Sequence, residues 1–394
     1  TFACRNIDCT FSLIYEGLPV ELCDELVYQN TPSLLFGTVD KFAQLAHKVS
    51  TVNTSAEKRA DSRRLFGRGS GMNFLTPDLI IQDELHLLQG PLGSAVGLYE
   101  SAVDKLCSRV EDGILLRPKI ISSTATTRNT GLQIRALYDR DVSVFPKNGT
   151  DYDDSFFSFF KRAKNNIDED SFFLSKRRYL GVMPTGGTQM TTQMRLAAMF
   201  FVHRALFEKD HLNELGNEAF VKAADYYYSL ISYFNSLREV GKTDAQFYLE
   251  FTKYTKRLFH RVLRNGELLE CYYANDRLLE KAELTGRLSG SEVVNELKHV
   301  DEHWALEERD RCRPPDFILA TNMISVGLDV SRFNSIIMNS MPRNIAEYIQ
   351  ASSRVARDSQ GLVITLHNPF RSRDISHFEK FKEFHEKMYY YVEP

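Results

Sequence analysis

The chain has 394 residues, of which 43% are hydrophobic and 26% charged, and its formal net charge is −3. This composition is typical of a globular protein with two or three domains, and it argues against a globally basic nucleic-acid binder while leaving room for a local basic groove. No run of about 18 apolar residues is present and the first residues lack a signal-peptide pattern, so we expect no membrane partner and a cytoplasmic location.

Three of the six cysteines lie near the beginning of the chain, at Cys4, Cys9 and Cys23. Three thiols are enough to raise the alternative of a zinc site, but their spacing differs from that of the common zinc motifs and no fourth ligand is evident. We favour reduced structural thiols, as expected for a cytosolic protein.

Residues 31–46 predict a short strand that turns into a helix, with Gly37 and Thr38 at the turn. A Thr hydroxyl and the free amides at a helix start suit a phosphate group. The alternative is an ordinary helix cap, and the local pattern by itself favours the cap.

Residues 78–88 are an apolar run that leads into two carboxylates and a histidine, Asp83, Glu84 and His86. The run predicts a buried parallel strand, which places the charged side chains at its carboxyl edge, where ligands of open α/β sheets bind. Asp83 is suited to hold Mg²⁺ through water, Glu84 to polarise a water that attacks a γ-phosphate, and His86 to connect the nucleotide with a second domain. The alternative is a solvated strand end.

Residues 118–128 predict a second buried strand, which ends in the hydroxyl side chains Ser123, Thr124 and Thr126. Hydrogen bonds from these hydroxyl groups would join the acidic cluster to a neighbouring domain. Alternatively, they cap the next helix.

A Phe-rich boundary over residues 144–176 separates this part from a second α/β unit. Residues 178–183 predict its first strand, residues 189–208 a helix, and residues 226–234 a strand that is followed by Asn235 and Ser236. Residues 244–264 predict a basic, aromatic helix, and residues 268–312 predict mostly helical structure, apart from a strand and turn over residues 284–289.

The last informative block predicts strands over residues 316–321 and 335–339, with Gly327 and Asp329 in the segment between them. Residues 345–357 predict a helix that carries Gln350, Arg354 and Arg357 on one face, because their spacings are four and three residues. Two arginines and a glutamine on one face suit an anion such as a γ-phosphate. The alternative is a surface helix with salt bridges.

The order of these motifs resembles that of superfamily 2 helicases and translocases, and the resemblance covers most of the chain. It implies an α/β fold with two RecA-like domains whose sheets are mostly parallel. We expect the first domain over residues 1–146 without its N-terminal phosphate-loop portion, a linker over 147–177, and the second domain over 178–394 with a helical insertion at about 240–312.

The resemblance also implies roles for the motif residues. Asp83 and Glu84 match the Walker B acids, with Asp83 as the metal ligand, and ATP and Mg²⁺ are the implied cofactors. Three groups of residues follow from the remaining motifs: the coupling residues His86, Ser123, Thr124 and Thr126, the nucleotide-lining residues Gly327 and Asp329, and the nucleic-acid contacts Thr38, Asn235, Ser236 and Thr321. Gln350, Arg354 and Arg357 match the last helicase motif, with the two arginines as finger candidates and Ser353 where that motif usually has Gly.

A narrower resemblance is carried by residues 36–42, 82–87, 233–238 and 376–379, which together are similar to the helicase family of the DISARM phage-defence system. It implies DNA, as a single strand or a duplex end, as the partner, and other subunits of the defence system as further partners.

One departure weakens the expectation of activity, because the loop Gly-x-x-x-x-Gly-Lys-Ser/Thr that cradles phosphates is missing from the chain. In this family the loop precedes the acidic cluster, so we expect it upstream of Thr1 and expect weak or no ATP turnover from these residues alone. The alternative function is an inactive helicase-like scaffold that binds nucleic acid or a partner protein.

Overall fold

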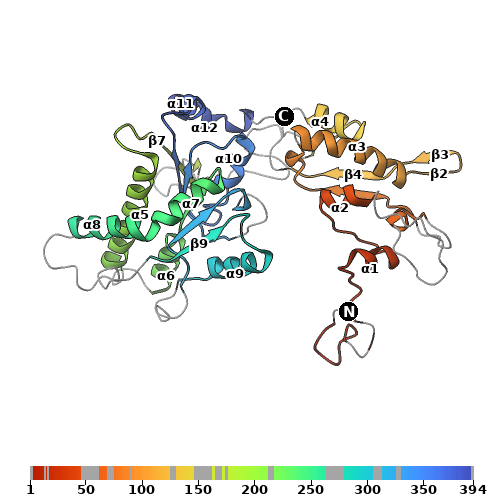
Figure 1. Cartoon of the computed structure of the whole chain (residues 1–394), viewed down its shortest axis with the longest axis horizontal. Coiled ribbons are helices and arrows are strands. Elements are labelled where there is room, and N and C mark those ends of the chain that lie inside the picture. The colour runs from red at the N-terminus through yellow and green to blue at the C-terminus, as the bar shows by residue number, and fades with distance from the viewer. Residues whose placement is uncertain are drawn as a thin grey trace. The chain divides into compact units, whose positions relative to one another are not determined.

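The structure is a computed structural model, and it describes residues 3–12, 15, 17–45, 62–68, 75–88, 90–124, 130–145, 162–164, 171–173, 176–211, 217–262, 279–304, 313–324 and 330–391. The chain divides into two compact units, Thr1–Phe145 and Pro146–Glu393. Each unit is described separately (Figure 1). Among the described residues, no helix combines the length and the apolar character needed to cross a membrane.

The first unit is built on two parallel strands, β1 (Leu79–Gln82) and β4 (Lys119–Ser122). Between them the chain forms the long helix α3 (Gly90–Cys107) and an antiparallel hairpin of β2 (Arg109–Glu111) and β3 (Ile114–Leu116). The remaining helical elements are α1 (Asp24–Gln29), α2 (Val39–Gln44), η2 (Ser62–Phe66), η3 (Leu85–Leu87) and α4 (Thr130–Tyr138).

The two-stranded sheet is covered on one face. Ile80 and Ile120 belong to apolar clusters with side chains of α3 and α4, whereas Leu79, Ile81 and Ile121 are 46%, 65% and 45% exposed. The prediction of a fully buried strand is therefore wrong for alternate residues. The physical reason is that, among the described residues, side chains of α3 and α4 pack against Ile80 and Ile120 on one face of the β1–β4 pair, while the side chains on the opposite face stay exposed.

The prediction of a strand before α2 is also wrong. Residues 31–38 are described and form no strand, and the helix that follows has only six residues.

The second unit contains a six-stranded sheet in the order β7-β12-β11-β8-β10-β9, and every neighbouring pair is parallel. The predicted α/β class with mostly parallel sheets is thus confirmed. The strands are β7 (Arg177–Val182), β8 (Leu230–Phe234), β9 (Lys281–Leu284), β10 (Phe317–Ala320), β11 (Ser335–Asn339) and β12 (Gly361–Leu366). A separate antiparallel pair, β5 (Arg162–Lys164) and β6 (Ser171–Phe173), precedes them.

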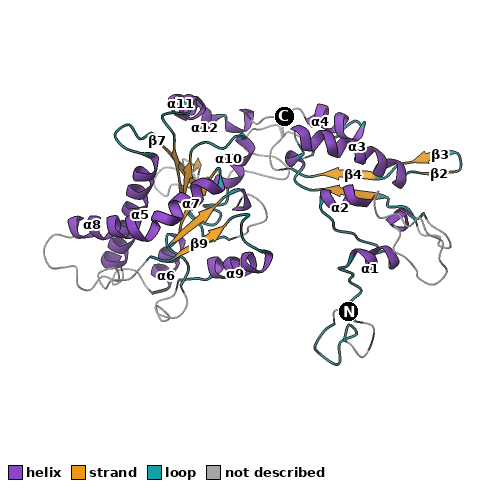
Figure 2. Ribbon diagram, in the orientation of Figure 1, coloured by secondary structure: helices purple, strands orange, loops and turns teal. Residues whose placement is uncertain are grey.

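Helices cover both faces of this sheet (Figure 2). Successive residues of one strand point to opposite faces, so Ile336 and Met338 of β11 join one apolar cluster while Ile337 joins the other. The first cluster includes side chains of α9 (Gly290–Asp301), α10 (Ile345–Ser352) and α12 (Phe381–Glu386). The second includes side chains of α5 (Gln189–His211), α7 (Leu237–Gln246) and η4 (Phe247–Phe251). The central strands are consequently buried on both faces, as a parallel sheet requires.

The helical elements of the second unit are α5 (Gln189–His211), α6 (Asn217–Tyr226), α7 (Leu237–Gln246), the π-helix η4 (Phe247–Phe251), α8 (Thr252–Val262), α9 (Gly290–Asp301), η6 (Asn322–Ile324), α10 (Ile345–Ser352), α11 (Ser372–Glu379), α12 (Phe381–Glu386) and η7 (Met388–Tyr391).

Two boundaries differ from the sequence prediction. The strand expected over 226–234 begins only at Leu230, because α6 continues to Tyr226. The stretch expected as a helical insertion, about 240–312, contains α8 and α9 but also β9, which pairs with β10 at the edge of the sheet. Part of the stretch therefore belongs to the sheet itself.

Candidate functional site

The acidic cluster of the first unit lies where its two parallel strands end. Gln82 pairs with Ser122, so the next residues, Asp83 and Ser123, emerge side by side at the same edge. The Ser123 hydroxyl donates a hydrogen bond to Asp83 Oδ1. The backbone also joins the two strand ends, because Ser123 N donates to Gln82 O at 2.9 Å and Leu85 N donates to Ser123 O at 3.0 Å.

Glu84, His86 and Thr124 form the second half of this cluster. Glu84 has a φ of 52°, in the left-handed region, and its N–H donates to Asp83 Oδ1 at 2.9 Å. His86 is 7% exposed, and its Nδ1 lies 3.1 Å from Glu84 Oε2 and 3.3 Å from Thr124 Oγ1. One ring nitrogen therefore contacts side chains from both strand ends.

The donor set at Asp83 is chemically suited to Mg²⁺, which prefers oxygen ligands and usually binds through one or two carboxylates together with water and substrate phosphates. Among the described residues, no group of three His, Cys, Asp or Glu side chains could hold a metal ion. A Mg²⁺ ion held by the single carboxylate of Asp83 would take most of its ligands from water and from phosphate oxygens.

Cysteines count among these possible metal ligands, so the amino-terminal cysteines form no such three-ligand group in the described residues. Cys4 and Cys23 are exposed and Cys9 is partly exposed, and all three are free thiols. The zinc alternative therefore has no support from the described residues.

Several predicted site residues lie elsewhere or outside the described residues. Thr126, Gly327 and Asp329 are not among the described residues. Thr38 belongs to the first unit, is exposed, and stands at the start of α2 without a side-chain capping hydrogen bond. Its hydroxyl is not used as the cap that the local pattern favoured.

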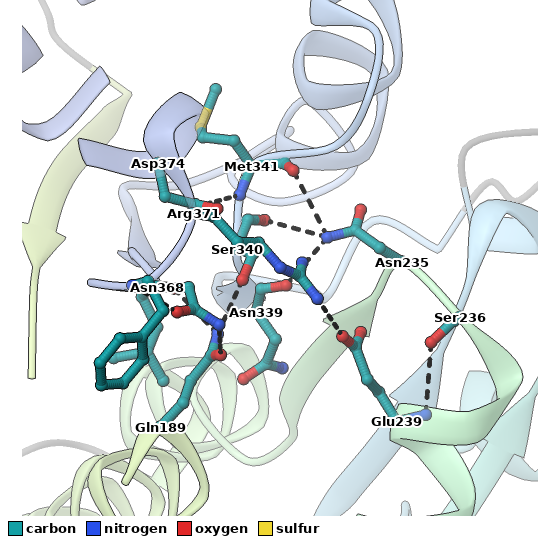
Figure 3. Close-up of polar contacts among 12 residues, drawn as sticks. Gln189, Asn235, Ser236, Glu239, Asn339, Ser340, Met341, Asn368, Arg371 and Asp374 are labelled. Carbon is teal, nitrogen blue, oxygen red and sulfur yellow. Dashed lines mark hydrogen bonds and ion pairs between the residues drawn. The ribbon is translucent and has the colours of Figure 1, made fainter. Parts of the chain in front are cut away.

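In the second unit, Asn235 follows β8 at the carboxyl edge of the sheet. Its Nδ2 donates toward three backbone carbonyls at the end of β11 and directly after it, those of Asn339 at 3.0 Å, Ser340 at 3.4 Å and Met341 at 3.5 Å (Figure 3). The amide group of Asn235 thus holds the segment after β11, and its contribution to a ligand site is first of all to position that segment.

The two other predicted nucleic-acid contacts of this unit differ from each other. Ser236 is exposed and caps α7, its hydroxyl accepting a hydrogen bond from Glu239 N at 3.4 Å. Thr321 follows β10, is only 6% exposed, and its Oγ1 has no hydrogen-bond partner among the described residues. A direct contact of Thr321 with a ligand would require its hydroxyl to be uncovered, whereas Ser236 is accessible.

Amide side chains from distant segments meet at the same edge (Figure 3). Gln189 Nε2 donates to Ser340 Oγ at 2.9 Å and to Leu366 O at 3.2 Å, and Gln189 Oε1 accepts from Asn368 Nδ2 at 3.1 Å. Ser340 has a φ of 69° and is fully buried. These contacts join the strand ends of β11 and β12 to the start of α5.

A buried ionisable pair, His367 and Asp374, lies next to these contacts. Asp374 accepts a hydrogen bond from Met341 N at 2.8 Å, and its Oδ1 lies 3.8 Å from His367 Nδ1. Burial, together with the neighbouring His377 and His385, lowers the pKa of His367 to about 4, whereas burial raises the pKa of Asp374. Both changes favour the neutral side chains.

The expected helix over residues 345–357 is too long. Helix α10 ends at Ser352, the Ser353 hydroxyl turns back to donate to Gln350 O at 2.9 Å, and Ala356 has a φ of 59°. Gln350 therefore lies in the helix and is 7% exposed, while Arg354 and Arg357 lie in the turn that follows. The prediction that the three share one helical face is wrong.

The turn that carries both arginines is held firmly at the amino end of the sheet. Arg177 donates from Nε to Val355 O at 2.9 Å and from Nη2 to Ser353 O at 3.1 Å, and Lys176 Nζ donates to Arg357 O at 2.5 Å. At Gly361 an added Cβ would lie 2.5 Å from Asn334 O, so only glycine fits where the turn re-enters β12. Arg354 and Arg357 are thus anchored through their backbone.

The sequence prediction missed all of the contacts that Gln189 makes with Ser340, Leu366 and Asn368. Gln189, Ser340 and Asn368 come from three segments, and nothing in their spacing along the chain connects them. A signal was present in the polar residues that directly follow the strands β11 and β12, since polar side chains at strand ends gather at one sheet edge.

Comparison with known proteins shows which proteins the chain resembles. Residues 254–359 match the Helicase conserved C-terminal domain. The chain is 35% identical over 409 aligned residues to the DISARM protein DrmA of Bacillus paralicheniformis, an alignment that covers 99% of this chain and 34% of that protein. The chain thus spans about a third of the length of this curated relative.

Similar solved structures are also helicases. The DUF1998 helicase MrfA bound to DNA is 15% identical, with 78% of this chain and 33% of that chain covered and a TM-score of 0.48. The helicase Lhr of Mycobacterium smegmatis bound to ssDNA and AMP-PNP is 13% identical, with 91% and 35% covered and a TM-score of 0.48. The resemblance to helicases, and to the helicase family of the DISARM system in particular, is confirmed by the match to the helicase C-terminal domain and by the similarity to DrmA.

Proposed function

We propose that this helicase-like chain, which is related to the DISARM protein DrmA and contains the conserved helicase C-terminal domain, is part of an ATP-dependent helicase or translocase that acts on DNA. The observation that carries the proposal is the cluster at the ends of β1 and β4. There, the Asp83 carboxylate bonds Ser123, and His86 contacts both Glu84 and Thr124. The relatives add that an MrfA structure holds DNA and AMPPNP and that the Lhr structure holds ssDNA and AMP-PNP.

Each side chain of the cluster then has a chemical task. Asp83 would hold Mg²⁺, which when bound neutralises phosphate charge and orients the phosphates. Glu84 is the general base, because its carboxylate can accept a proton from an attacking water. His86 positions that carboxylate through its Nδ1 contact at 3.1 Å.

His86 and Thr124 are proposed to couple hydrolysis to movement. The ring nitrogen of His86 contacts side chains from two strand ends, so a shift of the Glu84 carboxylate changes the contact with Thr124 as well. Ser123 plays the corresponding part for Asp83.

The second unit would supply the arginine fingers and part of the nucleic-acid path. Arg354 and Arg357 are the finger candidates, and their backbone anchors through Arg177 and Lys176 keep the turn in one conformation. Ser236 is the exposed candidate for a backbone phosphate, and Gln350, Gly327 and Asp329 remain proposed nucleotide contacts.

The test is the ATPase rate of the protein that contains this chain, with and without single-stranded DNA. We expect DNA-stimulated turnover that falls by about 10²–10⁴ in Glu84→Gln, because the general base is lost. The matched control is Glu111→Gln, which neutralises an exposed carboxylate on β2 and should leave the rate unchanged. Salt-sensitive DNA binding without any turnover would overturn the motor and leave a helicase-like scaffold.

A second variant tests the arginines. Arg357→Ala should reduce stimulated turnover by about 10³–10⁵ while DNA binding persists, because a finger stabilises the transition state rather than the bound DNA. Arg195→Ala, which removes an exposed arginine from α5, is the control. Near-normal turnover in Arg357→Ala would refute the finger assignment. For the 394 residues by themselves we expect weak or no turnover, since the phosphate-cradling loop is missing from this sequence.

A further inference from the structure

We infer that Phe370 is a base-stacking residue for single-stranded nucleic acid at the carboxyl edge of the second unit, with Arg371 as its phosphate-binding neighbour. The inference deepens the proposed function and rests on it, because it names the residue on which an unpaired base would lie. Phe370 is in the turn between β12 and α11, and no sequence motif singled it out.

Phe370 is 94% exposed, a higher fraction than that of any other large apolar side chain in the part of the chain that the structure describes. Single exposed apolar side chains are common on protein surfaces, so exposure by itself says little. The inference rests on the contacts that hold the backbone of Phe370 and on the charged side chains around it.

The backbone of Phe370 is held by side chains from other segments. Phe370 N donates to Asn368 Oδ1 at 2.9 Å, and Asn368 Nδ2 in turn donates to Gln189 Oε1 at 3.1 Å. Gln189 is fixed by Ser340, as described above (Figure 3). Pro369 restricts the turn further, because its ring fixes φ. An aromatic side chain is therefore presented to solvent on a rigid mount, which lowers the entropic cost of binding a ligand.

The surface around the turn is basic. Arg371 Nη2 bonds Glu239 Oε1 at 3.0 Å, and Arg373 Nη2 donates to Met341 O at 2.9 Å. The exposed Arg238 is next to Glu239 in the chain, and the exposed Arg343 is two residues beyond Met341. Four arginines consequently take part in these contacts or lie next to them in the chain, against the carboxylates of the half-buried Glu239 and the buried Asp374.

The ion pair of Arg371 with Glu239 is easily exchanged. The two side chains are 42% and 30% exposed, and a solvent-exposed pair of this kind contributes little to stability. A phosphate that approaches the turn can therefore take the place of Glu239 as the partner of Arg371. The guanidinium fork suits phosphate oxygens, and the exposed Ser236, whose hydroxyl accepts a hydrogen bond from Glu239 N, caps the helix that carries Glu239.

An aromatic ring beside arginines fits a nucleic acid better than a protein. Protein-docking patches are contiguous apolar surfaces, whereas the next residues of this turn are Arg371 and Ser372, both exposed and polar. Single-stranded nucleic acids are bound by the combination present here, aromatic stacking together with positive charge along the backbone. The stacking is independent of base identity, as a translocase requires.

The test uses oligothymidylate binding to the protein that contains this chain, measured by fluorescence anisotropy. Phe370→Ala should weaken binding by about 5- to 100-fold, the range given by the loss of one base stack. Phe370→Tyr should bind like the wild type, because the ring is retained. Leu249→Ala removes another exposed apolar side chain, 63% exposed on η4, and is the matched control.

A spectroscopic signal separates stacking from a structural role. The chain has one tryptophan, Trp304, which is 4% exposed, so the indole introduced by Phe370→Trp is the exposed one and its added fluorescence is identified by difference from wild type. We expect oligothymidylate to quench this added fluorescence at the concentrations at which it binds. Arg371→Gln should lower the salt dependence of binding by about one phosphate contact without abolishing the quenching.

The outcomes distinguish this inference from the function on which it rests. No binding of oligothymidylate by the wild-type protein would overturn both. Binding that is unchanged in Phe370→Ala, together with an unquenched indole, would overturn the stacking role alone. Quenching by an unrelated partner protein but not by the oligonucleotide would assign the ring to a protein interface and also overturn the inference.

Discussion

Strands of similar sequence are buried to different extents in the two units. In the first unit, β1 and β4 form a two-stranded sheet in which Ile81 is 65% exposed, whereas in the second unit Ile337, the third residue of β11, is fully buried. The strands are similar in sequence, since both are apolar runs that end in polar residues. Burial is therefore decided by the number of neighbouring strands and covering helices, and the acidic cluster of Asp83, Glu84 and His86 lies in the unit whose strands are less covered.

The comparison can be tested with one probe in each unit. Trp304 packs with Phe220 and Tyr228 in the second unit, so its fluorescence follows the unfolding of that unit. Cys107 is 2% exposed in the first unit, and burial raises the pKa of its thiol to about 12, so its rate of labelling follows the opening of the first unit.

The largest effect is expected from a buried ion pair of the second unit. Arg204 Nη2 lies 2.6 Å from Asp316 Oδ1, with side-chain exposures of 2% and 0%, and Arg204 Nη1 also donates to Tyr228 O. Arg204→Met leaves the Asp316 carboxylate buried without the positive charge of Arg204, although Glu280 N still donates to Oδ2, so the free energy of unfolding reported by Trp304 should fall by about 3–5 kcal/mol.

The control for this prediction is a more exposed pair of the first unit. Arg117 Nη2 lies 2.5 Å from Asp104 Oδ2, with the arginine side chain 37% exposed. Arg117→Met should change the opening free energy reported by Cys107 by less than about 1 kcal/mol, because water screens the pair. Equal losses in the two variants would contradict the difference in burial between the units.

The second prediction truncates matched strand residues. Ile337→Ala removes packed methyl groups from a core cluster and should lower the stability of the second unit by about 2–5 kcal/mol. Ile81→Ala removes methyl groups that already face water and should cost the first unit less than about 1 kcal/mol. Denaturant titrations read by Trp304 and Cys107 check both, and a large loss in Ile81→Ala would show that another layer covers that face.

The same contrast explains which parts of the fold were predictable. An apolar run identified β10, β11 and β1 equally well, because a run reports that the residues form a strand. It does not report how many neighbours the strand has, so the burial of β1 was predicted wrongly. The strand predicted within residues 284–289 begins where β9 (Lys281–Leu284) ends, because the sequence of β9, Lys-Ala-Glu-Leu, alternates charge with small or apolar residues at the edge of the sheet and gives no apolar run.

The candidate sites were predictable only where the residues follow one another in the chain. Asp83, Glu84 and His86 were identified because they directly follow a strand, and Ser123 because the next strand ends beside them. The turn after α10 was predicted as helix because the spacing of Gln350 and Arg354 fits one. Spacing could not reveal the hydrogen bond of Ser353 back to Gln350 O or the positive φ at Ala356.

The third prediction concerns pH and the buried histidine of the second unit. The pKa of His367 is lowered to about 4 in the folded protein, whereas in the unfolded chain it is near its ordinary value of 6.5. Between these values the unfolded chain binds a proton that the folded protein does not, so this histidine contributes stability above pH 6.5 that is lost as the pH falls toward 4. The contribution amounts to about 3 kcal/mol.

Asp374 acts in the opposite direction, because its pKa is raised and its stabilising contribution is lost as the pH rises. The histidine is isolated by comparing the wild type with His367→Phe, which retains Asp374 as well as Arg371 and Arg373. The pH-dependent loss between about 6.5 and 4, measured with Trp304, should be reduced in the variant. Parallel profiles for the two proteins would rule out His367 as its source.

The smallest effects are expected at a feature that the two units share. Each unit places a residue other than glycine in the left-handed region directly at the end of a strand, Glu84 near β1 with a φ of 52° and Ser340 after β11 with a φ of 69°. A Cβ is unfavourable there, and glycine avoids the clash but costs entropy on folding. In each unit the glycine variant should therefore be more stable than the alanine variant by about 0.5–1 kcal/mol.

Comparing glycine with alanine removes the side-chain contacts from the measurement. Glu84→Gly and Glu84→Ala both lose the contact with His86, and Ser340→Gly and Ser340→Ala both lose the hydrogen bond from Gln189. What remains is the backbone conformation, read by Cys107 for the first pair and by Trp304 for the second. If glycine is favoured at both positions, the two units share a strained strand end despite their different burial. If alanine is as stable as glycine at Glu84, the strained strand end belongs to the well-covered sheet alone.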